Sequence, residues 1–377
     1  MKASHFLPVL ALTATLSAQA QVPVPSPPTV DARAYLVVDF NSGAELAGAN
    51  AGEAMEPASI TKLMSVYVAF TELRAGRLAM DDRVLISERA WRMPGSRMFV
   101  DVNTRVRLED MLRGIIIQSG NDATVALAEH IAGTEEAFAE MMNAHAQRLG
   151  MNDSHFTNST GMPDAEMYTT ARDIATLTIA MIRDFPEDYA LYSEREFTWN
   201  NIRQTNRNML LWRDSTVDGV KTGHTESAGY CLVTSALRNE QRLVSVVFGT
   251  RSERARADIS LALLNYGFRF FETHRLYAAG TELAEARVWK GTGEAVPVGL
   301  QEDLWITIPR GSYRNLTAAM DMQSQLVAPV DTEQEVGRVR VTLNDELVAE
   351  RTLHTLAPVA EGSIWRRAVD TVLLWFE

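Results

Sequence analysis

The distribution of hydrophobic and polar residues divides the chain into two regions of different pattern. From about residue 34 to residue 271, strand-like runs alternate with long helical segments, which predicts an α/β domain over residues 34–278. Residues 34–40 are apolar and β-branched and precede the turn signal Asn41-Ser42-Gly43, so the domain is expected to open with a hairpin. Residues 230–237 and 243–249 predict a second hairpin. Helices are predicted around residues 60–73, 108–116, 123–131, 135–149 and 171–182.

Beyond residue 279 the pattern changes to short runs in which apolar and polar residues alternate. Residues 286–289, 304–308 and 338–343 are such runs, and Gly, Pro or Asn-Asp bound them. Period-two strands at this spacing predict a small β-sandwich over residues 279–360 that follows the α/β domain.

The last segment, residues 361–377, has the pattern of an amphipathic helix. It is too short to cross a bilayer, which needs about 20 apolar residues, but a helix with tryptophans at its apolar edge fits a membrane interface. Packing onto the β domain is the alternative. The apolar positions at helical spacing are Ile364, Trp365, Ala368, Val369, Val372, Leu373 and Trp375, and the charged positions on the other side are Arg366, Arg367 and Asp370.

The first twenty residues have the features of a secretory signal peptide. Lys2 is their only lysine or arginine, they contain no acidic residue, and a short apolar run precedes the small-residue site Ala18-Gln19-Ala20. We predict cleavage after Ala20 and export of the mature chain. Residues 21–33, which are rich in proline, are expected to form an extended linker.

Composition and charge exclude several classes of protein. The chain has 377 residues, of which 46% are hydrophobic and 22% charged, as in globular proteins. Its formal net charge of -12 disfavours nucleic acid as a partner. Cys231 is the only cysteine, so the chain forms no internal disulfide, and its apolar surroundings favour a place in the core. The histidines lack a zinc-peptidase spacing, so neither a metal nor another cofactor is expected.

The first chemical signal is Ser59 followed by Lys62 at the start of a helix. Residues three apart share a face of a helix, so the hydroxyl and the amine are expected to meet near the helix N-terminus. A serine becomes a nucleophile when a base removes its proton, and a buried lysine with a lowered pKa can be that base. Backbone N–H groups at the helix end favour developing negative charge. By itself the pair also fits a capped helix with a surface lysine.

Two further short motifs strengthen this interpretation. Ser119-Gly120-Asn121 lies in a predicted turn between two apolar segments, where it can present a hydroxyl and an amide to a cleft. Lys221-Thr222-Gly223 is expected to open the strand before residues 230–237. Its lysine and threonine suit a carboxylate ligand, and its glycine allows close approach of the backbone to a ligand. In this order the three motifs form a strong joint signal.

The motifs and their surroundings resemble one known family. Residues 116–123, 218–225 and the phenylalanine-rich residues 266–272 read like D-alanyl-D-alanine carboxypeptidases of the penicillin-binding protein 5/6 type. The resemblance covers roughly residues 23–377. It implies a domain of the serine β-lactamase and penicillin-binding transpeptidase type, with an antiparallel sheet and helices. A small β-sandwich domain and a C-terminal membrane-anchor helix would follow it.

The resemblance also implies a role for each motif residue. Ser59 would form the acyl-enzyme, Lys62 would be its general base, and Ser119 would carry a proton toward the leaving D-alanine. Asn121 would hold the peptide side of the substrate, and the backbone N–H groups of Ser59 and His224 would form the oxyanion hole. The groups placed near the substrate carboxylate are Lys221 and Thr222, which would also help to keep Lys62 neutral, and Arg207, for which an ion pair at the sheet edge is the alternative.

The predicted function is therefore removal of the terminal D-alanine from peptidoglycan pentapeptide by a serine D,D-carboxypeptidase that β-lactams inhibit covalently. The predicted location is the periplasm, at the outer face of the inner membrane. A β-lactamase on the same fold and a catalytically inactive cell-wall scaffold remain as alternatives. The E-x-x-L-N pattern of class A β-lactamases is missing, which disfavours the first, and the intact motifs disfavour the second.

Overall fold

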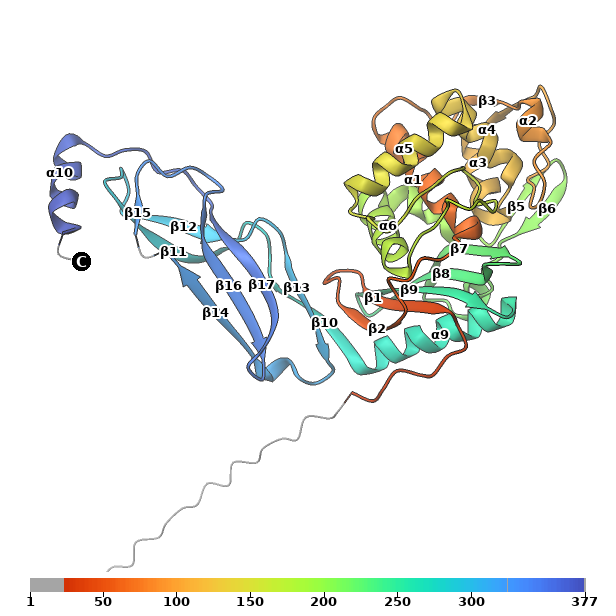
Figure 1. Cartoon of the computed structure of the whole chain (residues 1–377). Helices are drawn as coiled ribbons and strands as arrows, with labels where there is room; N and C mark the ends of the chain where they lie inside the picture. The colour runs from red at the N-terminus through yellow and green to blue at the C-terminus, as the bar shows by residue number, and fades with distance from the viewer. Residues whose placement is uncertain (1–23, 324, 376–377) are drawn as a thin grey trace, which may run out of the picture.

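The computed structural model describes residues 24–323 and 325–375, so the predicted signal peptide at residues 1–20 lies outside the described residues. The described chain forms a mixed α/β body, an elongated all-β body and a short C-terminal helix, in the predicted order (Figure 1). The C-terminal helix lies at the end of the β body that is remote from the α/β body (Figure 1).

An antiparallel five-stranded sheet lies at the centre of the α/β body. In spatial order its strands are β2 (Glu45–Ala49), β1 (Ala34–Asp39), β9 (Gln241–Thr250), β8 (Gly229–Arg238) and β7 (Val217–Thr225). Both predicted hairpins are confirmed, since β1 pairs with β2 and β8 pairs with β9. β9 also pairs with β1, so the start and the end of the domain meet in the sheet, and β7 is an edge strand.

The sheet is buried on both faces because successive side chains of a strand point to opposite sides. In β1, Leu36 and Val38 belong to the core under the helices, whereas Tyr35 and Val37 belong to the core on the opposite face. In a strand that is buried on both faces, nearly every residue is apolar. Residues 34–40 and 243–249 show this pattern.

A layer of helices covers one face of the sheet (Figure 1). The predicted helices are confirmed, and α1 passes through the middle of the layer with every residue from 62 to 70 buried. The elements of this part are η1 (Ala58–Thr61), α1 (Lys62–Arg74), α2 (Glu88–Trp91), α3 (Leu108–Arg113), the π-helix η2 (Gly114–Gln118), α4 (Asn121–Ala132), α5 (Glu135–Arg148), α6 (Ala171–Asp184), α7 (Pro186–Tyr189), η3 (Ala190–Ser193) and α8 (Leu210–Arg213).

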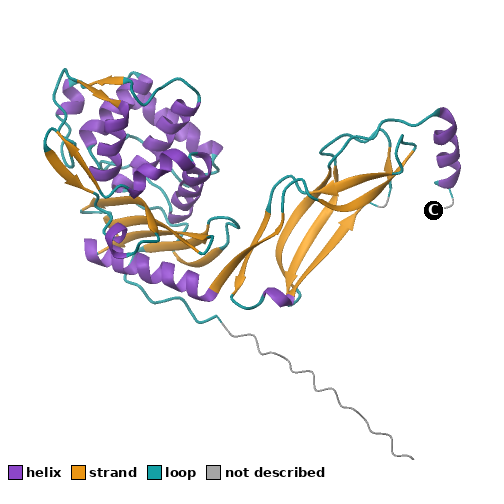
Figure 2. Cartoon of the chain, turned by 180° about the vertical axis from the view of Figure 1, so that it is seen from behind, coloured by secondary structure: helices purple, strands orange, loops and turns teal. Residues whose placement is uncertain are grey.

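One long helix that the sequence analysis did not predict covers the other face of the sheet. This helix, α9 (Glu253–Phe270), begins after Ser252, whose hydroxyl accepts a hydrogen bond from Ala255 N, and it buries Leu263 and Leu264 (Figure 2). Two small two-stranded sheets were also not predicted, one formed by β3 (Arg83–Leu85) with β4 (Arg105–Arg107) and one by β5 (Glu196–Trp199) with β6 (Ile202–Thr205).

The β body contains a six-stranded sheet and a two-stranded sheet. The six strands, in spatial order, are β14 (Leu316–Met322), β16 (Glu335–Leu343), β17 (Glu346–Thr355), β12 (Ala295–Gly299), β11 (Glu282–Trp289) and β15 (Leu326–Val327). β10 (Phe271–Tyr277) pairs with β13 (Leu304–Pro309), and η4 (Tyr313–Asn315) precedes β14. Because its partner is β13, β10 belongs with the β body, although the sequence analysis placed residues 271–277 before the boundary at residue 278.

Hydrogen bonds between buried polar groups connect the two bodies. The Asp39 carboxylate, at the end of β1, is fully buried and accepts hydrogen bonds from Ser42 N at 2.8 Å and from Thr273 Oγ1 of β10 at 2.5 Å. Thr307 Oγ1 of β13 lies 2.6 Å from Ser42 Oγ and 2.8 Å from Thr273 Oγ1. The opening hairpin is therefore bonded directly to the β body.

The described part of the predicted linker, residues 24–33, contains no helix or strand but does not stand free. Tyr266 Oη of α9 donates a hydrogen bond to Pro25 O at 2.9 Å, and Val24, Val30 and Ala32 pack on the core beneath α9. This segment is extended, as expected, and it lies along the α/β body.

Cys231 lies in the core of the α/β body, as its apolar surroundings predicted. It is on β8, its side chain is fully buried, and its Sγ lies 3.6 Å from Ala228 O. Burial raises the pKa of this thiol to about 11. Cys231 is therefore a core residue and not a nucleophile.

The C-terminal helix, α10 (Ile364–Leu373), contacts the end of the β body through polar groups. Arg366 Nη2 lies 3.3 Å from Glu294 Oε1, and Asp370 Oδ2 accepts a hydrogen bond from Lys290 N at 2.6 Å. Ser363 caps the helix by accepting a hydrogen bond from Arg366 N. Within the described ranges, no helix has the length and apolar character to cross a membrane.

Candidate active site

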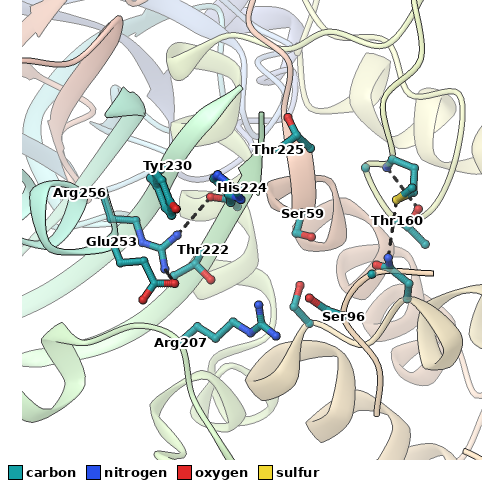
Figure 3. Close-up of a pocket in the computed structure, with 16 residues that line it drawn as sticks. Ser59, Ser96, Thr160, Arg207, Thr222, His224, Thr225, Tyr230, Glu253 and Arg256 are labelled. Carbon is teal, nitrogen blue, oxygen red and sulfur yellow. Dashed lines mark hydrogen bonds and ion pairs between the residues drawn. The ribbon is translucent and has the colours of Figure 1, made fainter. Parts of the chain in front are cut away.

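A polar cleft of about 410 Å³ opens where edge strand β7 meets η1 and the start of α4. Figure 3 shows Ser59 between Thr222 and His224 on one side and Thr160 on the other. Residues from all three predicted motifs line it, so the fold brings together segments that are far apart in the sequence. The lining residues are Ser59, Gly95, Ser96, Ser119, Asn121, Thr160, Gly161, Met162, Arg207, Thr222, Gly223, His224, Thr225, Tyr230, Glu253 and Arg256.

Ser59 and Lys62 meet as their spacing predicted. Ser59 lies in the 3₁₀ turn η1, which leads directly into α1 at Lys62, so the two side chains are one turn apart. Lys62 Nζ lies 3.0 Å from Ser59 Oγ. The Lys62 side chain is fully buried beneath the cleft, which excludes the alternative of a surface lysine on a capped helix.

The Lys62 amine has two further partners, and both are acceptors. Nζ donates to Asn121 Oδ1 and to Thr160 O, each at 2.7 Å. A neutral amine has two N–H groups and one lone pair. With both N–H groups directed at these oxygens, the lone pair faces the Ser59 hydroxyl, which is the arrangement that proton removal from serine requires.

The surroundings of Lys62 bring its pKa close to neutrality. Burial and, to a smaller extent, the positive charge of Arg207 lower the pKa of Lys62 from its ordinary value of 10.5 to about 7. The negative charges of Asp122 and Glu135 act in the opposite direction. A lysine with such a pKa is present as the neutral base in a large fraction of molecules at pH 7.

In the motif Ser119-Gly120-Asn121, the chain turns at Ser119, and Asn121 begins helix α4. Ser119 follows η2 in the left-handed conformation, with φ of 66°, and its buried Oγ has no hydrogen-bond partner among the described residues. Asn121 is the first residue of α4, not part of a turn, because Gly120 already caps that helix. Its Nδ2 donates to Pro94 O at 2.7 Å, which orients Oδ1 toward Lys62.

The third motif lies inside β7 and does not open it. β7 begins at Val217, so Lys221, Thr222 and Gly223 fall in its second half, where Thr222 and His224 line the cleft. Lys221 is buried, and its Nζ donates to Thr222 O at 3.1 Å. Burial lowers the pKa of Lys221 strongly, and the positive charge of Lys62 lowers it further.

The glycine of this motif has a packing role that the sequence analysis did not foresee. A Cβ at Gly223 would lie 3.1 Å from Ile60 Cγ1 and 3.2 Å from Pro57 O. Its absence lets β7 pack closely against the turn that carries Ser59. Close packing of two walls of the cleft is therefore one role of this glycine, which itself also lines the cleft.

Arg207 lies at the cleft with its guanidinium unpaired. No carboxylate of the described residues forms an ion pair with it, and Figure 3 shows its head directed into the cleft near Ser96. Burial lowers its pKa, and the charge of Glu253 partly offsets this effect. The alternative role in an ion pair at the sheet edge is wrong, because α9 places Glu253 beside Arg256 instead.

Two residues that line the cleft, Arg256 on α9 and Tyr230 on β8, were not predicted from the sequence. Arg256 is 3% exposed and donates to Gly223 O at 3.2 Å, and its guanidinium lies over the ring of Tyr230. The rings of Tyr230 and His224 stack with centroids 3.9 Å apart. The serine at position 252 was the signal in the sequence for the start of α9, the helix on which Arg256 lies.

The contribution of Thr160, which lies in a loop before α6, was also missed. Asn158 Oδ1 accepts hydrogen bonds from Gly161 N at 2.8 Å and from Thr160 N at 3.1 Å, which folds the loop tightly. A Cβ at Gly161 would lie 1.7 Å from Ala58 O, and its φ is +81°, so this position requires glycine. The asparagine and glycine were the signal in the sequence for a tight turn here.

Comparison with known proteins identifies the family. Residues 21–252 match the family described as D-alanyl-D-alanine carboxypeptidase, peptidase S11, and residues 271–361 match the penicillin-binding protein 5 C-terminal domain. The chain belongs to the D-alanyl-D-alanine carboxypeptidase family. The second match begins at the first residue of β10, in agreement with the pairing of that strand.

Individual family members are similar over nearly the whole chain. D-alanyl-D-alanine carboxypeptidase DacA of Escherichia coli K12 is 40% identical over 361 residues, which cover 94% of this chain and 90% of the relative. DacA of Haemophilus influenzae is 42% identical over 355 residues, 93% of this chain and 90% of the relative. The crystal structure of penicillin-binding protein 5 from H. influenzae superposes with a TM-score of 0.87 at 42% identity, covering 89% of this chain and all of that one.

The family membership confirms the resemblance drawn from the three motifs. It confirms the predicted fold, a penicillin-binding domain with an antiparallel sheet followed by a β domain. It also confirms the predicted enzyme class, a serine-type D-Ala-D-Ala carboxypeptidase. The β-lactamase and the inactive scaffold are not favoured.

Proposed function

We propose that Ser59, activated by Lys62, attacks the carbonyl of the penultimate D-alanine in a peptidoglycan pentapeptide. The observation that carries this proposal is the Lys62 amine, fully buried, with two acceptors on its N–H groups and Ser59 Oγ at 3.0 Å. Lys62 Nζ takes the Oγ proton as the new C–O bond forms, and the carbonyl oxygen becomes negatively charged. The N–H groups of Ser59 and His224 receive this charge.

The intermediate then breaks down by loss of the terminal D-alanine. The C–N bond breaks, and Ser119 Oγ passes a proton, originally from Ser59 by way of Lys62, to the leaving amine. The unpartnered, buried hydroxyl of Ser119 suits this relay. A water molecule then attacks the ester carbonyl and gives a proton to Lys62, which passes it to Ser59 Oγ as the bond between Oγ and the acyl carbon breaks. The products are the shortened peptide and free enzyme.

The other motif residues position the substrate in this proposal. Arg207, unpaired at the cleft, binds the terminal carboxylate together with Thr222, and the Lys221 amine supports this strand from the buried side by donating to Thr222 O. Asn121 holds Lys62 as well as the peptide side of the substrate. The strained amide of a β-lactam, which also carries a carboxylate, enters the same cleft and acylates Ser59.

The acylation rate is expected to rise with pH through a midpoint near 7. The reactive form of Lys62 is the neutral amine, so protonation below its pKa of about 7 removes the base. Well below the midpoint, the rate constant should fall about tenfold per pH unit. Intact-mass kinetics with benzylpenicillin from about pH 5 to about pH 9 measure this. The acid limb of the profile is the part at low pH where the rate falls. A profile without an acid limb in this range would exclude Lys62 as the base.

We further infer that the enzyme acts in the periplasm and is held at the outer face of the inner membrane by α10. The supporting observation is an inverted burial pattern in this helix. Its polar residues Arg366 and Asp370 face the β body, whereas its apolar residues are exposed. An apolar face of this size on a short helix fits the interfacial region of a bilayer. The large exposed apolar residues are Ile364 (80%), Trp365 (83%), Val369 (56%), Val372 (56%), Leu373 (46%) and Trp375 (84%).

Removal of the tail from Ser363 onward is expected to abolish vesicle binding and to leave acylation unchanged. The truncation removes the exposed apolar face, and the elements that line the cleft belong to the α/β body, at the other end of the molecule from α10 (Figure 1). Co-sedimentation of the mature chain with vesicles containing anionic lipid provides the measurement. Val369→Glu in the full chain serves as a second test, because it places a charge in the apolar face without shortening the protein. Equal sedimentation of all three proteins would contradict the anchor.

A further inference from the structure

A buried carboxylate outside the cleft is connected to Lys62 through a single loop. Glu135 is the first residue of α5, and its side chain is 7% exposed. Its Oε1 accepts hydrogen bonds from Ser159 N at 3.1 Å and Ser159 Oγ at 2.6 Å. Its Oε2 accepts a hydrogen bond from Arg89 Nη2 at 2.8 Å. Both oxygens of this carboxylate are therefore engaged, each as an acceptor.

The residue held by Glu135 directly precedes the carbonyl that contacts Lys62. Ser159 O accepts a hydrogen bond from Ser65 Oγ of α1 at 2.6 Å, so Ser159 is fixed through its N–H, its hydroxyl and its carbonyl. The next carbonyl, Thr160 O, then accepts the hydrogen bond from Lys62 Nζ. The direction of this carbonyl decides where one N–H of the amine points.

We propose that Glu135 is a positioning residue for the reaction, which keeps the Thr160 carbonyl on Lys62 Nζ and thereby aims the amine at Ser59 Oγ. This inference rests on the proposed role of Lys62 as the base. A carboxylate is required because Ser159 and Arg89 both donate. A glutamine would satisfy one of them with its oxygen and present its NH₂ group to the other.

The charge of Glu135 has a second, separable effect on the same amine. The Lys62 amine lies near the positive charge of Arg207 and the negative charges of Asp122 and Glu135. Burial and Arg207 lower the pKa of Lys62, and the two carboxylates raise it. Removal of the Glu135 charge therefore lowers this pKa further, so the amine stays neutral at a lower pH.

The test compares acylation by benzylpenicillin over a range of pH in the full mature chain and three variants. Glu135→Gln should lower the rate on the alkaline plateau about 10- to 100-fold and move the acid limb to lower pH. Glu135→Asp keeps the charge but is one methylene shorter, so its plateau should fall while its acid limb stays near that of the wild type. Glu72→Gln is the matched control, a buried glutamate paired with Arg77 on another face, and should change neither.

The outcomes separate this inference from the proposed function. An unshifted acid limb in Glu135→Gln, or an unchanged plateau, would overturn the inference. Normal acylation by Lys62→Arg would instead overturn the role of Lys62 itself. If Glu135→Gln does not fold, Ser159→Ala replaces it, since it removes one hydrogen bond to Glu135 and keeps the charge. Its plateau should fall without a shift of the limb, and an unchanged plateau would also overturn the inference.

Discussion

Replacement of Ser59 by alanine is expected to abolish the covalent adduct with benzylpenicillin. Ser59 carries the only serine or threonine hydroxyl of the described residues that is hydrogen-bonded to Lys62 Nζ, so no other hydroxyl has a base in contact with it. Release of D-alanine from a peptide ending in D-Ala-D-Ala should fall by about 10⁴-fold or more. Intact-mass spectrometry detects the adduct directly.

Ser96 provides the matched control for this experiment. It also lines the cleft but makes no hydrogen bond to Lys62, so Ser96→Ala should still gain the mass of one drug molecule. An adduct in Ser59→Ala at the same peptide as in the wild type would show that the nucleophile has been assigned incorrectly.

Replacement of Lys62 by arginine is expected to have a comparably large effect. Arginine keeps the positive charge but is not deprotonated in proteins, so Ser59 loses its base at every accessible pH. The larger guanidinium must also fit a fully buried space between Asn121 and Thr160. The acylation rate constant should fall by about 10³-fold or more.

Lys290 offers a control with the same substitution in the β body. Lys290→Arg should acylate normally, because this residue is remote from the cleft. Near-normal acylation of Lys62→Arg at neutral pH would remove Lys62 from the mechanism.

The features that the sequence predicted well are those in which short-range spacing determines the geometry. Ser59 and Lys62 meet because three residues make about one turn whether that turn is 3₁₀ or α-helical. The hairpins were predicted because apolar runs flank polar turns, and in a sheet covered on both faces those runs are nearly continuous. The joint order of the three motifs then indicated the family.

The features that were missed depend on contacts between distant segments. Thr160 contributes a backbone carbonyl to Lys62, and a carbonyl leaves no signature in residue type. Glu135 follows the helix cap Thr134 and looks in sequence like an ordinary acidic residue of a first turn. Its burial becomes visible only once the loop at Ser159 folds back onto α5. In α9, a buried arginine at position 256 interrupts the apolar spacing that would have indicated the helix.

The sealed position of Cys231 makes this chain suitable for spectroscopy with thiol-reactive labels. Its side chain has no exposed surface and its pKa is raised to about 11, so maleimide reagents at neutral pH have neither access to it nor a thiolate to react with. Cys231 therefore does not need to be replaced before labels are attached to introduced cysteines. A pair of cysteines introduced at the cleft rim and on α10 would carry both labels of a distance measurement. Such a pair would report how the terminal helix is oriented when vesicles are added.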